Sequence, residues 1–225
     1  MKRLSPFSTP FVLPAVLERA VQCLRAGGLV AYPTDTVYGL GAAAGNDEAV
    51  RRLFEAKDRP LDRALPLLLA SAEQVGLLAV DVPPVAHRLM AAFWPGGLTL
   101  VLRRAPSYRS LALGAGDTVA VRVPDHPIPR QLVEGLGEPI TGTSANRSGA
   151  RSPRTAAEVR RQLGDMVEMV IDGGPSPGGV ESTVVDCTVD PPRLLRQGAV
   201  AWEDIKRVMA EARSGPCVAP RQGLC

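Results

Sequence analysis

Aromatic and metal-binding side chains are scarce in this sequence. Only 4% of the residues are Phe, Trp or Tyr, too few for the stacking surfaces that bind single-stranded RNA. The four cysteines form no Cys-x-x-Cys pair and only two histidines are present, so a structural zinc site is not expected. Cys23 and Cys187 lie in apolar runs, and their thiols are predicted to be buried.

Long apolar runs and strong charge are missing as well. The sequence has no stretch of about 18 apolar residues that could span a membrane. Pro6, Pro10 and Pro14 interrupt the N-terminal apolar stretch, which therefore lacks the continuous core of a signal peptide. We expect a soluble, cytoplasmic protein with no membrane contact. The formal net charge of +3 is too small to identify a nucleic-acid binder, and it does not exclude one.

What remains is a globular composition with many turns. The 225 residues, 45% hydrophobic and 22% charged, suffice to bury a sizeable core. Its 22 glycines and 21 prolines make up roughly 19% of the chain against about 12% on average, so helices and strands should be short. One domain is expected, with a tail beyond Ser214 where periodicity ends.

Helices and strands are predicted to alternate. Apolar positions recur at helical spacing over 14–24, beginning at Pro14, and over 47–54, where Asn46 is the cap. Thr155 and Glu158 form a capping box that begins the helix expected over 156–163. The other helices are expected over 85–93, 128–136 and 205–212. Strands are expected over 29–32, 65–70, 98–102, 119–123, 170–171, 183–185 and 193–195.

This order of elements predicts the fold class. Short strands, some consecutive and some separated by helices, favour an α/β protein of the α+β type, with one twisted, mixed β-sheet flanked by helices in a single domain. Pro66, inside the predicted strand over 65–70, indicates an edge strand or the first strand position.

The most polar short segment is Pro-Thr-Asp-Thr-Val-Tyr-Gly-Leu-Gly at 33–41, directly after the predicted strand over 29–32. Its hydroxyls, carboxylate and phenol offer more hydrogen-bonding capacity than a connecting turn requires. The segment therefore predicts the floor of a small-molecule pocket. The alternative is a tight strand-loop-strand connection.

A cationic segment, Lys57-Asp58-Arg59-Pro60, ends the second predicted helix, and Arg63 follows shortly after. Lys57 continues the apolar stripe from Val50 and is expected to face the body of the protein. Cations two residues apart can converge on one phosphate, lysine as a point charge and arginine as a fork. The alternative is a pair of solvated cations favoured by the helix dipole.

Two later segments are rich in hydroxyl groups. If Thr141–Gly149 is extended, Ser144 and Asn146 point to the same face, and a hydroxyl beside an amide suits a ribose or a phosphate. Composition alone would make this segment a polar loop. Residues 178–186 combine a glycine turn with a strand that begins Glu-Ser-Thr; the alternative is a hairpin with a polar start.

Seven short motifs follow one another along the chain: Pro-Thr-Asp-Thr-Val-Tyr-Gly-Leu-Gly, Lys-x-Arg-Pro, Trp-Pro-Gly-Gly-Leu-Thr, Val-Arg-Val-Pro-Asp-His-Pro, Thr-Ser-Ala-Asn-Arg-Ser-Gly, Ile-Asp-Gly-Gly and Glu-Ser-Thr-Val-Val-Asp. In this order they resemble the YrdC-type threonylcarbamoyl-AMP synthases, in their short single-domain form without the C-terminal domain and gating segment of longer relatives. The similarity runs from about Ala15 to Gly198. It implies a YrdC-like catalytic domain over 15–212, an N-terminal extension over 1–14 and a flexible tail over 213–225.

The resemblance implies a nucleotidyltransferase that makes threonylcarbamoyl-adenylate and pyrophosphate from L-threonine, bicarbonate and ATP. Mg²⁺ would accompany ATP, held largely by phosphates and water, with no metal site on the protein itself. A partner complex would then transfer the threonylcarbamoyl group to the adenosine next to the tRNA anticodon, and tRNA itself would bind weakly if at all. The alternative is an RNA-binding maturation factor without synthase activity, using Arg51, Arg52, Arg151, Arg154, Arg160 and Arg161.

The resemblance also implies roles for individual residues. Lys57 and Arg59 are the catalytic candidates, placed along the ATP phosphates. L-Threonine would contact Thr36, Arg122, Gly142 and Ser182, with the arginine fork on its carboxylate. The ATP side would comprise Lys57, Arg59, Arg63, Thr118, Ser144, Asn146, Ser152 and Arg196.

Three ionisable residues and two departures from the family complete the expectations. Asp35, His126 and Asp186 are expected to be structural. Leu68 stands where many members have a histidine, and Arg63 where they have asparagine, so one amino-acid contact is absent and Arg63 acts differently on the nucleotide. Gln197 replaces the usual proline of Arg-Pro-Gly.

Overall fold

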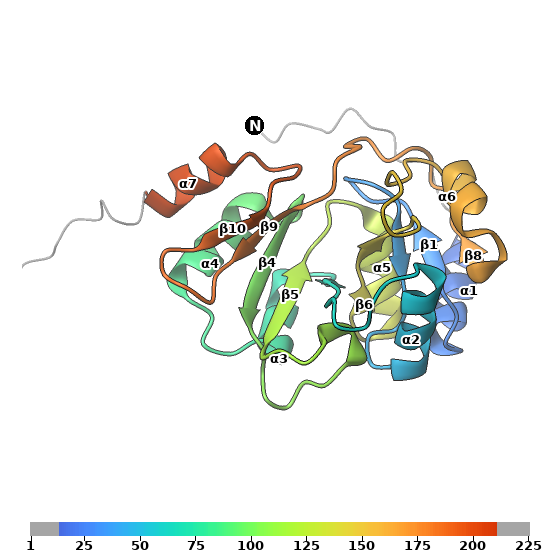
Figure 1. The fold of residues 1–225 in the computed structure, drawn as a ribbon, viewed down its shortest axis with the longest axis horizontal. Helices are drawn as coiled ribbons and strands as arrows, with labels where there is room; N and C mark the ends of the chain where they lie inside the picture. The colour runs from blue at the N-terminus through green and yellow to red at the C-terminus, as the bar shows by residue number, and fades with distance from the viewer. Residues whose placement is uncertain (1–13, 211–225) are drawn as a thin grey trace, which may run out of the picture.

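The computed structural model describes residues 14–210, which form two mixed β-sheets packed among helices (Figure 1). The predicted class is confirmed, because strands and helices alternate and both sheets contain parallel and antiparallel pairs. The prediction of one sheet is wrong. The expected N-terminal extension and C-terminal tail lie outside the described residues, apart from Pro14.

The smaller sheet has four strands in the order β7-β2-β1-β8. Its central strand β1 (Val30–Tyr32) is fully buried, pairs antiparallel with β2 (Gly39–Gly41) and pairs parallel with β8 (Met169–Val170). The edge strand β7 (Thr143–Ser144) adds to β2. The segment 33–41 therefore connects two paired strands, as the alternative prediction for it stated.

The larger sheet has six strands in the order β10-β9-β4-β5-β3-β6. β4 is parallel to β9 and antiparallel to β5. β3 lies between β5 and β6, so Pro66 precedes an internal strand and not an edge strand. The bounds are β3 (Leu67–Leu68), β4 (Leu98–Arg103), β5 (Thr118–Arg122), β6 (Ile140–Thr141), β9 (Thr183–Asp186) and β10 (Arg193–Arg196).

The two sheets meet where the chain leaves β6 and enters β7. An isolated bridge joins Ala43 to Ile140, and the Tyr32 hydroxyl in β1 donates to the carbonyl of Thr141 in β6 at 2.9 Å. The Tyr32 ring also covers the two glycines of β2, because a Cβ at Gly39 would lie 2.7 Å from the ring. The glycines of the 33–41 segment therefore let an aromatic residue link the sheets.

The helices begin and end close to where the sequence placed them. Asn46 caps α2 by accepting from the Ala49 amide at 3.0 Å. The Thr155 hydroxyl accepts from the Glu158 amide at 3.2 Å, which is one of the two hydrogen bonds of a capping box. The Glu158 carboxylate accepts from the amide of Arg154, one residue before the cap, so the expected box is only half formed. The helices are α1 (Pro14–Arg25), α2 (Asp47–Ala56), α3 (Val75–Leu78), α4 (Pro84–Phe93), α5 (Pro127–Leu136), α6 (Ala156–Leu163) and α7 (Trp202–Ala210), with single 3-10 turns at Ala72–Gln74, Leu111–Leu113 and Gly164–Met166.

Two buried apolar clusters hold the layers together. The larger one gathers side chains from both sheets with α2, α4 and α6, and the smaller one lies between α1, α5 and β1. Cys187 belongs to the larger cluster, whereas Cys23 is only partly buried, contrary to expectation. None of the helices within 14–210 has the length and apolar character needed to cross a membrane.

Candidate active site

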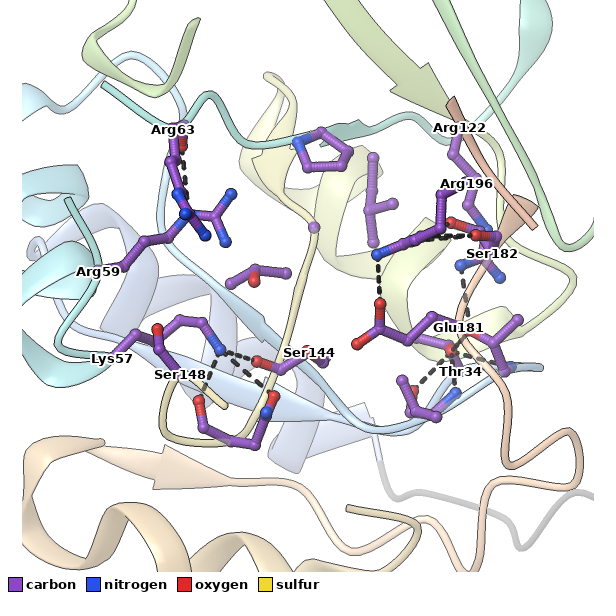
Figure 2. Close-up of a pocket in the computed structure, with 18 of the residues that line it drawn as sticks. Thr34, Lys57, Arg59, Arg63, Arg122, Ser144, Ser148, Glu181, Ser182 and Arg196 are labelled. Carbon is purple, nitrogen blue, oxygen red and sulfur yellow. Dashed lines mark hydrogen bonds and ion pairs between the residues drawn. The ribbon is translucent and has the colours of Figure 1, made fainter. Parts of the chain in front are cut away.

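The four polar segments converge on one cavity of about 320 Å³ at the junction of the two sheets. Figure 2 shows Lys57, Arg59, Arg63 and Ser148 toward one side of it, and Arg122, Arg196, Ser182 and Thr34 toward the other. Ten of the twelve expected site residues line the cavity: Thr36, Lys57, Arg59, Arg63, Arg122, Gly142, Ser144, Asn146, Ser182 and Arg196.

The loop between β1 and β2 is fixed by the hydroxyl of Thr34. It donates to the Val37 carbonyl at 2.7 Å and accepts from the amides of Thr36 and Val37. The Thr34 and Thr36 hydroxyls also lie 2.9 Å apart and form a hydrogen bond in which either can be the donor. Thr36 therefore places its hydroxyl in the cavity wall beside a loop that Thr34 holds in shape.

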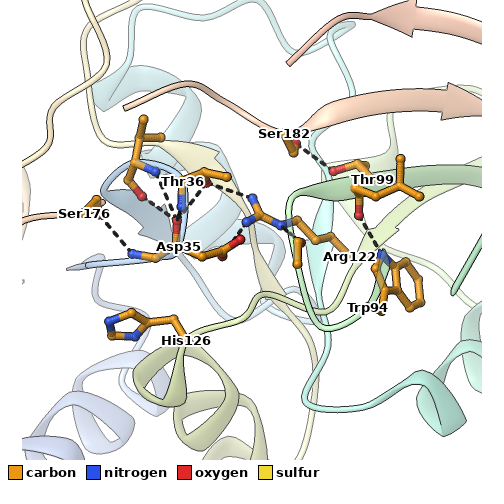
Figure 3. Close-up of polar contacts among 12 residues, drawn as sticks. Asp35, Thr36, Trp94, Thr99, Arg122, His126, Ser176 and Ser182 are labelled. Carbon is orange, nitrogen blue, oxygen red and sulfur yellow. Dashed lines mark hydrogen bonds and ion pairs between the residues drawn. The ribbon is translucent and has the colours of Figure 1, made fainter. Parts of the chain in front are cut away.

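Arg122 is the most constrained cation of the site. It ends β5, and its guanidinium donates to Asp35 at 2.6 Å, to the Thr36 hydroxyl at 3.0 Å and to the Gly96 carbonyl at 2.9 Å (Figure 3). Burial lowers the pKa of Arg122, and the Asp35 carboxylate opposes this shift. Three of its five N–H groups are thus occupied, and one on each terminal nitrogen remains for a ligand. Asp35 has the structural role that was expected.

The segment that leads into β9 lies directly on the first loop. The amides of Gly178 and Gly179 donate to the carbonyls of Asp35 and Thr36, at 3.1 and 2.7 Å. A Cβ at Gly178 would lie 2.7 Å from the Asp35 carbonyl oxygen, so no larger residue allows this approach. The contact brings the Ser182 hydroxyl, which pairs with the Thr99 hydroxyl at 2.8 Å, into the cavity wall (Figure 3).

Lys57 faces inward, as predicted, but its ammonium has partners that were not foreseen. Lys57 is 2% exposed, and Nζ donates to the carbonyls of Ser144 and Asn146 and to the Asn146 side-chain oxygen. Burial, together with the charge of Arg59, lowers its pKa to about 8. The chain reverses at Asp58, whose φ is +51°, so Lys57 and Arg59 turn to different backbone segments.

Arg59, which is partly buried, and the exposed Arg63 provide the accessible positive charge on one side of the cavity. Arg59 donates to the carbonyls of Arg63 and Ala64, both at 3.1 Å, which leaves N–H groups free to meet a ligand. Burial lowers the pKa of Arg59, and repulsion from Arg63 and Arg196 adds to the effect. Mutually repelling guanidinium groups around one cavity favour an anionic ligand.

Glu181 is the one acidic side chain that lines the described cavity, and the sequence reading did not assign it a role. It pairs with Arg196 and accepts from the Ser152 hydroxyl at 2.8 Å. Burial alone would raise the pKa of Glu181, but Arg196 and the hydroxyls of Ser152 and Ser144 outweigh it and lower the pKa. Its place directly before Ser182 was the only signal available in the sequence.

Two expected ATP-binding residues do not line the cavity. Ser152 stands behind the lining and acts through Glu181. Thr118 begins β5, at the opposite end of that strand from Arg122. Side chains four residues apart on a strand share a face but lie about 13 Å apart along it. Thr118 is therefore too far from Arg122 to line the same cavity.

His126 and Asp186 have the structural contacts that were expected. His126 caps α5, its Nδ1 accepting from the Ile128 amide at 3.2 Å, and burial lowers its pKa to about 4. Asp186 accepts from the amide and hydroxyl of Thr188 and pairs with Arg193. Neither lines the cavity.

Sequence reasoning missed other parts of the wall. Thr34, Ser148 and Ala150 flank assigned residues and could have been included by adjacency. Pro66 and Leu68 form an apolar part of the wall, and Leu68 contacts Gly142 so closely that a Cβ there would lie 2.7 Å away. The leucine in place of a family histidine therefore faces the cavity.

The chain is similar to known proteins along most of its length. The family model Sua5_yciO_yrdC, described as telomere recombination, matches residues 22–198. The threonylcarbamoyl-AMP synthase of Pyrococcus abyssi is 48% identical over 195 residues, which cover 87% of this chain and 57% of the relative. A putative threonylcarbamoyl-AMP synthase of Mycobacterium tuberculosis is 43% identical, over 84% of this chain and 87% of the relative.

Solved structures give the same result. P. abyssi Sua5 complexed with L-threonine superposes with a TM-score of 0.84 at 47% identity, covering 87% of this chain and 57% of that one. E. coli YciO superposes with a TM-score of 0.77 at 29% identity, covering 84% and 92%. The chain spans 57% and 56% of the length of the P. abyssi and Bacillus subtilis curated relatives. Sequence and structure therefore place this chain in the Sua5/YciO/YrdC family.

Proposed function

We propose that the protein is an L-threonylcarbamoyladenylate synthase, which uses L-threonine, bicarbonate and ATP. The observation that carries the proposal is one cavity with a buried arginine fork at one end and a cluster of repelling cations at the other. Relatives that bear this activity in their names, and a Sua5 structure complexed with L-threonine, support it.

The chemistry needs no nucleophile from the protein. The threonine amine attacks bicarbonate carbon, water leaves, and a carbamate forms; a carbamate oxygen then attacks the α-phosphorus of ATP and pyrophosphate departs. The protein must hold three reactants together and stabilise charge on the phosphoryl group. A cavity lined by oriented N–H groups and hydroxyls is suited to that task.

The amino acid belongs at the Arg122 end in this proposal. The two remaining N–H groups of Arg122 pair with the threonine carboxylate. The Thr36 hydroxyl faces the amine, and Ser182 and the backbone at Gly142 complete the wall. Asp35 keeps the guanidinium in place.

The nucleotide belongs at the other end. Arg59 and Arg63 meet its phosphates, with Ser144 and Asn146 along the same wall. Arg196, which donates to Ser182 on the opposite side, faces the nucleotide from there. Ser152 lies behind the lining and donates to Glu181, and Thr118 lies outside the cavity. Mg²⁺ fits only as a companion of ATP, because the single lining carboxylate, Glu181, is already paired with Arg196. Phosphate oxygens and water would supply most of its ligands.

The product would feed a tRNA-modifying complex, which transfers the threonylcarbamoyl group to the adenosine beside the anticodon. An enzyme that spends ATP for tRNA maturation would work in the cytoplasm. Direct contact with tRNA is not required by this scheme.

Pyrophosphate release from purified protein tests the proposal. Release should require threonine and bicarbonate together, and mass spectrometry should detect threonylcarbamoyl-adenylate. Arg59→Ala should slow the reaction strongly, whereas the matched substitution of exposed Arg207 in α7 should not. No release under any condition, with tight and salt-sensitive tRNA binding instead, would favour the RNA-binding maturation factor.

A further inference from the structure

The ammonium of Lys57 is saturated by the protein itself. An ammonium has three N–H donors, and the acceptors around Nζ are the Ser144 carbonyl, the Asn146 carbonyl at 2.6 Å and the Asn146 side-chain oxygen at 3.4 Å. With 2% exposure, the group has little access to solvent. A phosphate could reach Nζ only by displacing one of these acceptors.

All three acceptors belong to residues 144–150, which we name the Asn146 loop. The loop also binds the backbone of Lys57, since the Ser148 amide donates to the Lys57 carbonyl at 3.0 Å. The Asn146 amide group donates to the carbonyls of Arg147 and Ala150, at 3.0 and 2.7 Å, and closes the loop on itself. Lys57 is thus held by the loop through its side chain and its main chain.

The Asn146 loop forms one wall of the cavity. Ser144, Asn146, Ser148, Gly149 and Ala150 all line it. Figure 2 shows the Lys57 ammonium directed at this wall and away from Arg59 and Arg63. Arg59 lacks such an anchor on the loop, because it binds the carbonyls of Arg63 and Ala64.

We propose that Lys57 is a positioning residue, which fixes the Asn146 loop so that the loop presents its hydroxyls and backbone to the nucleotide phosphates, while Arg59 contacts the phosphates directly. The proposal rests on the synthase function proposed above. It differs from the role that the family resemblance implied, in which Lys57 lies along the phosphates.

Hydrogen exchange tests the loop directly and needs no substrate. In Lys57→Met, the Ser148 amide should exchange about tenfold faster or more, because its loop loses its central donor. Lys206→Met is the matched control, since Lys206 lies on α7 and, within residues 14–210, pairs with Glu203 alone; it should leave the loop unchanged. Lys57→Gln retains donors for the carbonyls and should restore part of the protection. Unchanged exchange in Lys57→Met overturns the proposal.

Double-mutant kinetics separate positioning from phosphate contact. Lys57→Met should lower kcat/KM for ATP about 100-fold, the size expected for a misplaced wall. Combining Lys57→Met with Asn146→Ala should add little, whereas combining it with Arg59→Ala should multiply the two losses. The reverse pattern would mean that Lys57 and Arg59 act together on the phosphates, and the proposal would fail.

The two proposals fail in different ways. If wild-type protein releases no pyrophosphate, the synthase function is wrong, and the exchange result still decides whether Lys57 holds the loop. If Lys57→Met does not fold, Lys57→Gln and Asn146→Ala carry the same comparisons. Normal activity with faster loop exchange would show that the loop does not serve the reaction, and would overturn the catalytic half of the proposal.

Discussion

Replacing Arg122 by alanine should affect both stability and threonine use, for separable reasons. The side chain of Arg122 is 8% exposed, and the side chain of Asp35 is 17% exposed. Removing the arginine leaves the Asp35 carboxylate buried without its cation, which costs about 3–5 kcal/mol for a fully buried pair. Because Asp35 keeps some contact with water, we expect the free energy of unfolding to fall by about 3 kcal/mol.

Asp35→Asn makes the complementary change. Arg122 then keeps its bonds to the Thr36 hydroxyl and the Gly96 carbonyl, so the loss should be about 1.5–3 kcal/mol, the value of one hydrogen bond to a charged group. The double variant should be more stable than the sum of the single losses predicts, with a coupling energy of about 1–3 kcal/mol. Urea unfolding, followed by fluorescence, measures all three values.

Steady-state kinetics then separate folding from binding. Arg122→Ala should raise KM for threonine about 10- to 100-fold, since a fork on a carboxylate is lost, and should raise KM for ATP much less. Asp35→Asn retains the guanidinium and should change KM for threonine only a few-fold. A larger effect of Arg122→Ala on ATP would mean that the two ends of the cavity have been exchanged, and equal effects of both variants on threonine would refute the direct contact.

Three further predictions concern the titration of Lys57, the packing around Gly198 and the extent of the nucleotide site toward Thr118. The pKa of Lys57 is lowered from 10.5 to about 8 by burial and by Arg59, with Glu181 opposing, so between these pH values the unfolded chain holds a proton that the folded protein has released. The free energy of unfolding should therefore rise with pH across that window by up to about 3 kcal/mol, and urea titrations of Lys57→Met should lack the rise. Gly198→Ala places a Cβ 2.3 Å from the Glu181 carbonyl oxygen and should cost about 1–3 kcal/mol in urea unfolding, whereas Gly76→Ala, with nothing within 4 Å, should be neutral or stabilising. Thr118→Ala should leave KM for ATP unchanged; a clear increase would show that the nucleotide extends beyond the cavity.

The sequence predicted best what depends on local interactions. Helices α2 and α6 begin at caps, Asn46 and Thr155, whose hydrogen bonds are made within one turn. β2, β6 and β7 are two or three residues long, too short for any periodicity to be visible. They exist because distant partners pair with them, and the division into two sheets follows from those pairings.

The site shows the same limit at the level of side chains. The family resemblance identified ten of the twenty residues that line the cavity, but it did not indicate which protein atoms each would contact. Lys57 and Arg59 look equivalent in the sequence, yet the left-handed turn at Asp58 sends one to the Asn146 loop and the other to the Arg63 carbonyl. Ser144 and Asn146 were expected to act alike, but Asn146 is 6% exposed and spends its amide within the loop.

The cavity concentrates positive charge in a protein whose overall net charge is only +3. Main-chain carbonyls hold these cations before any ligand arrives: Lys57 on Asn146, Arg59 on Ala64, Arg122 on Gly96 and Arg196 on Ser182. Carbonyls orient a cation without neutralising it, so the positive potential remains for an anionic ligand. If a carboxylate held each of these cations in place of a carbonyl, the empty site would be more stable, but it would bind phosphate more weakly. In the part of the chain that the structure describes, Asp35 pairs with Arg122 and Glu181 with Arg196, and no carboxylate pairs with Arg59. The Arg59 end of the cavity is therefore the one where the electrostatic gain from a triphosphate is largest.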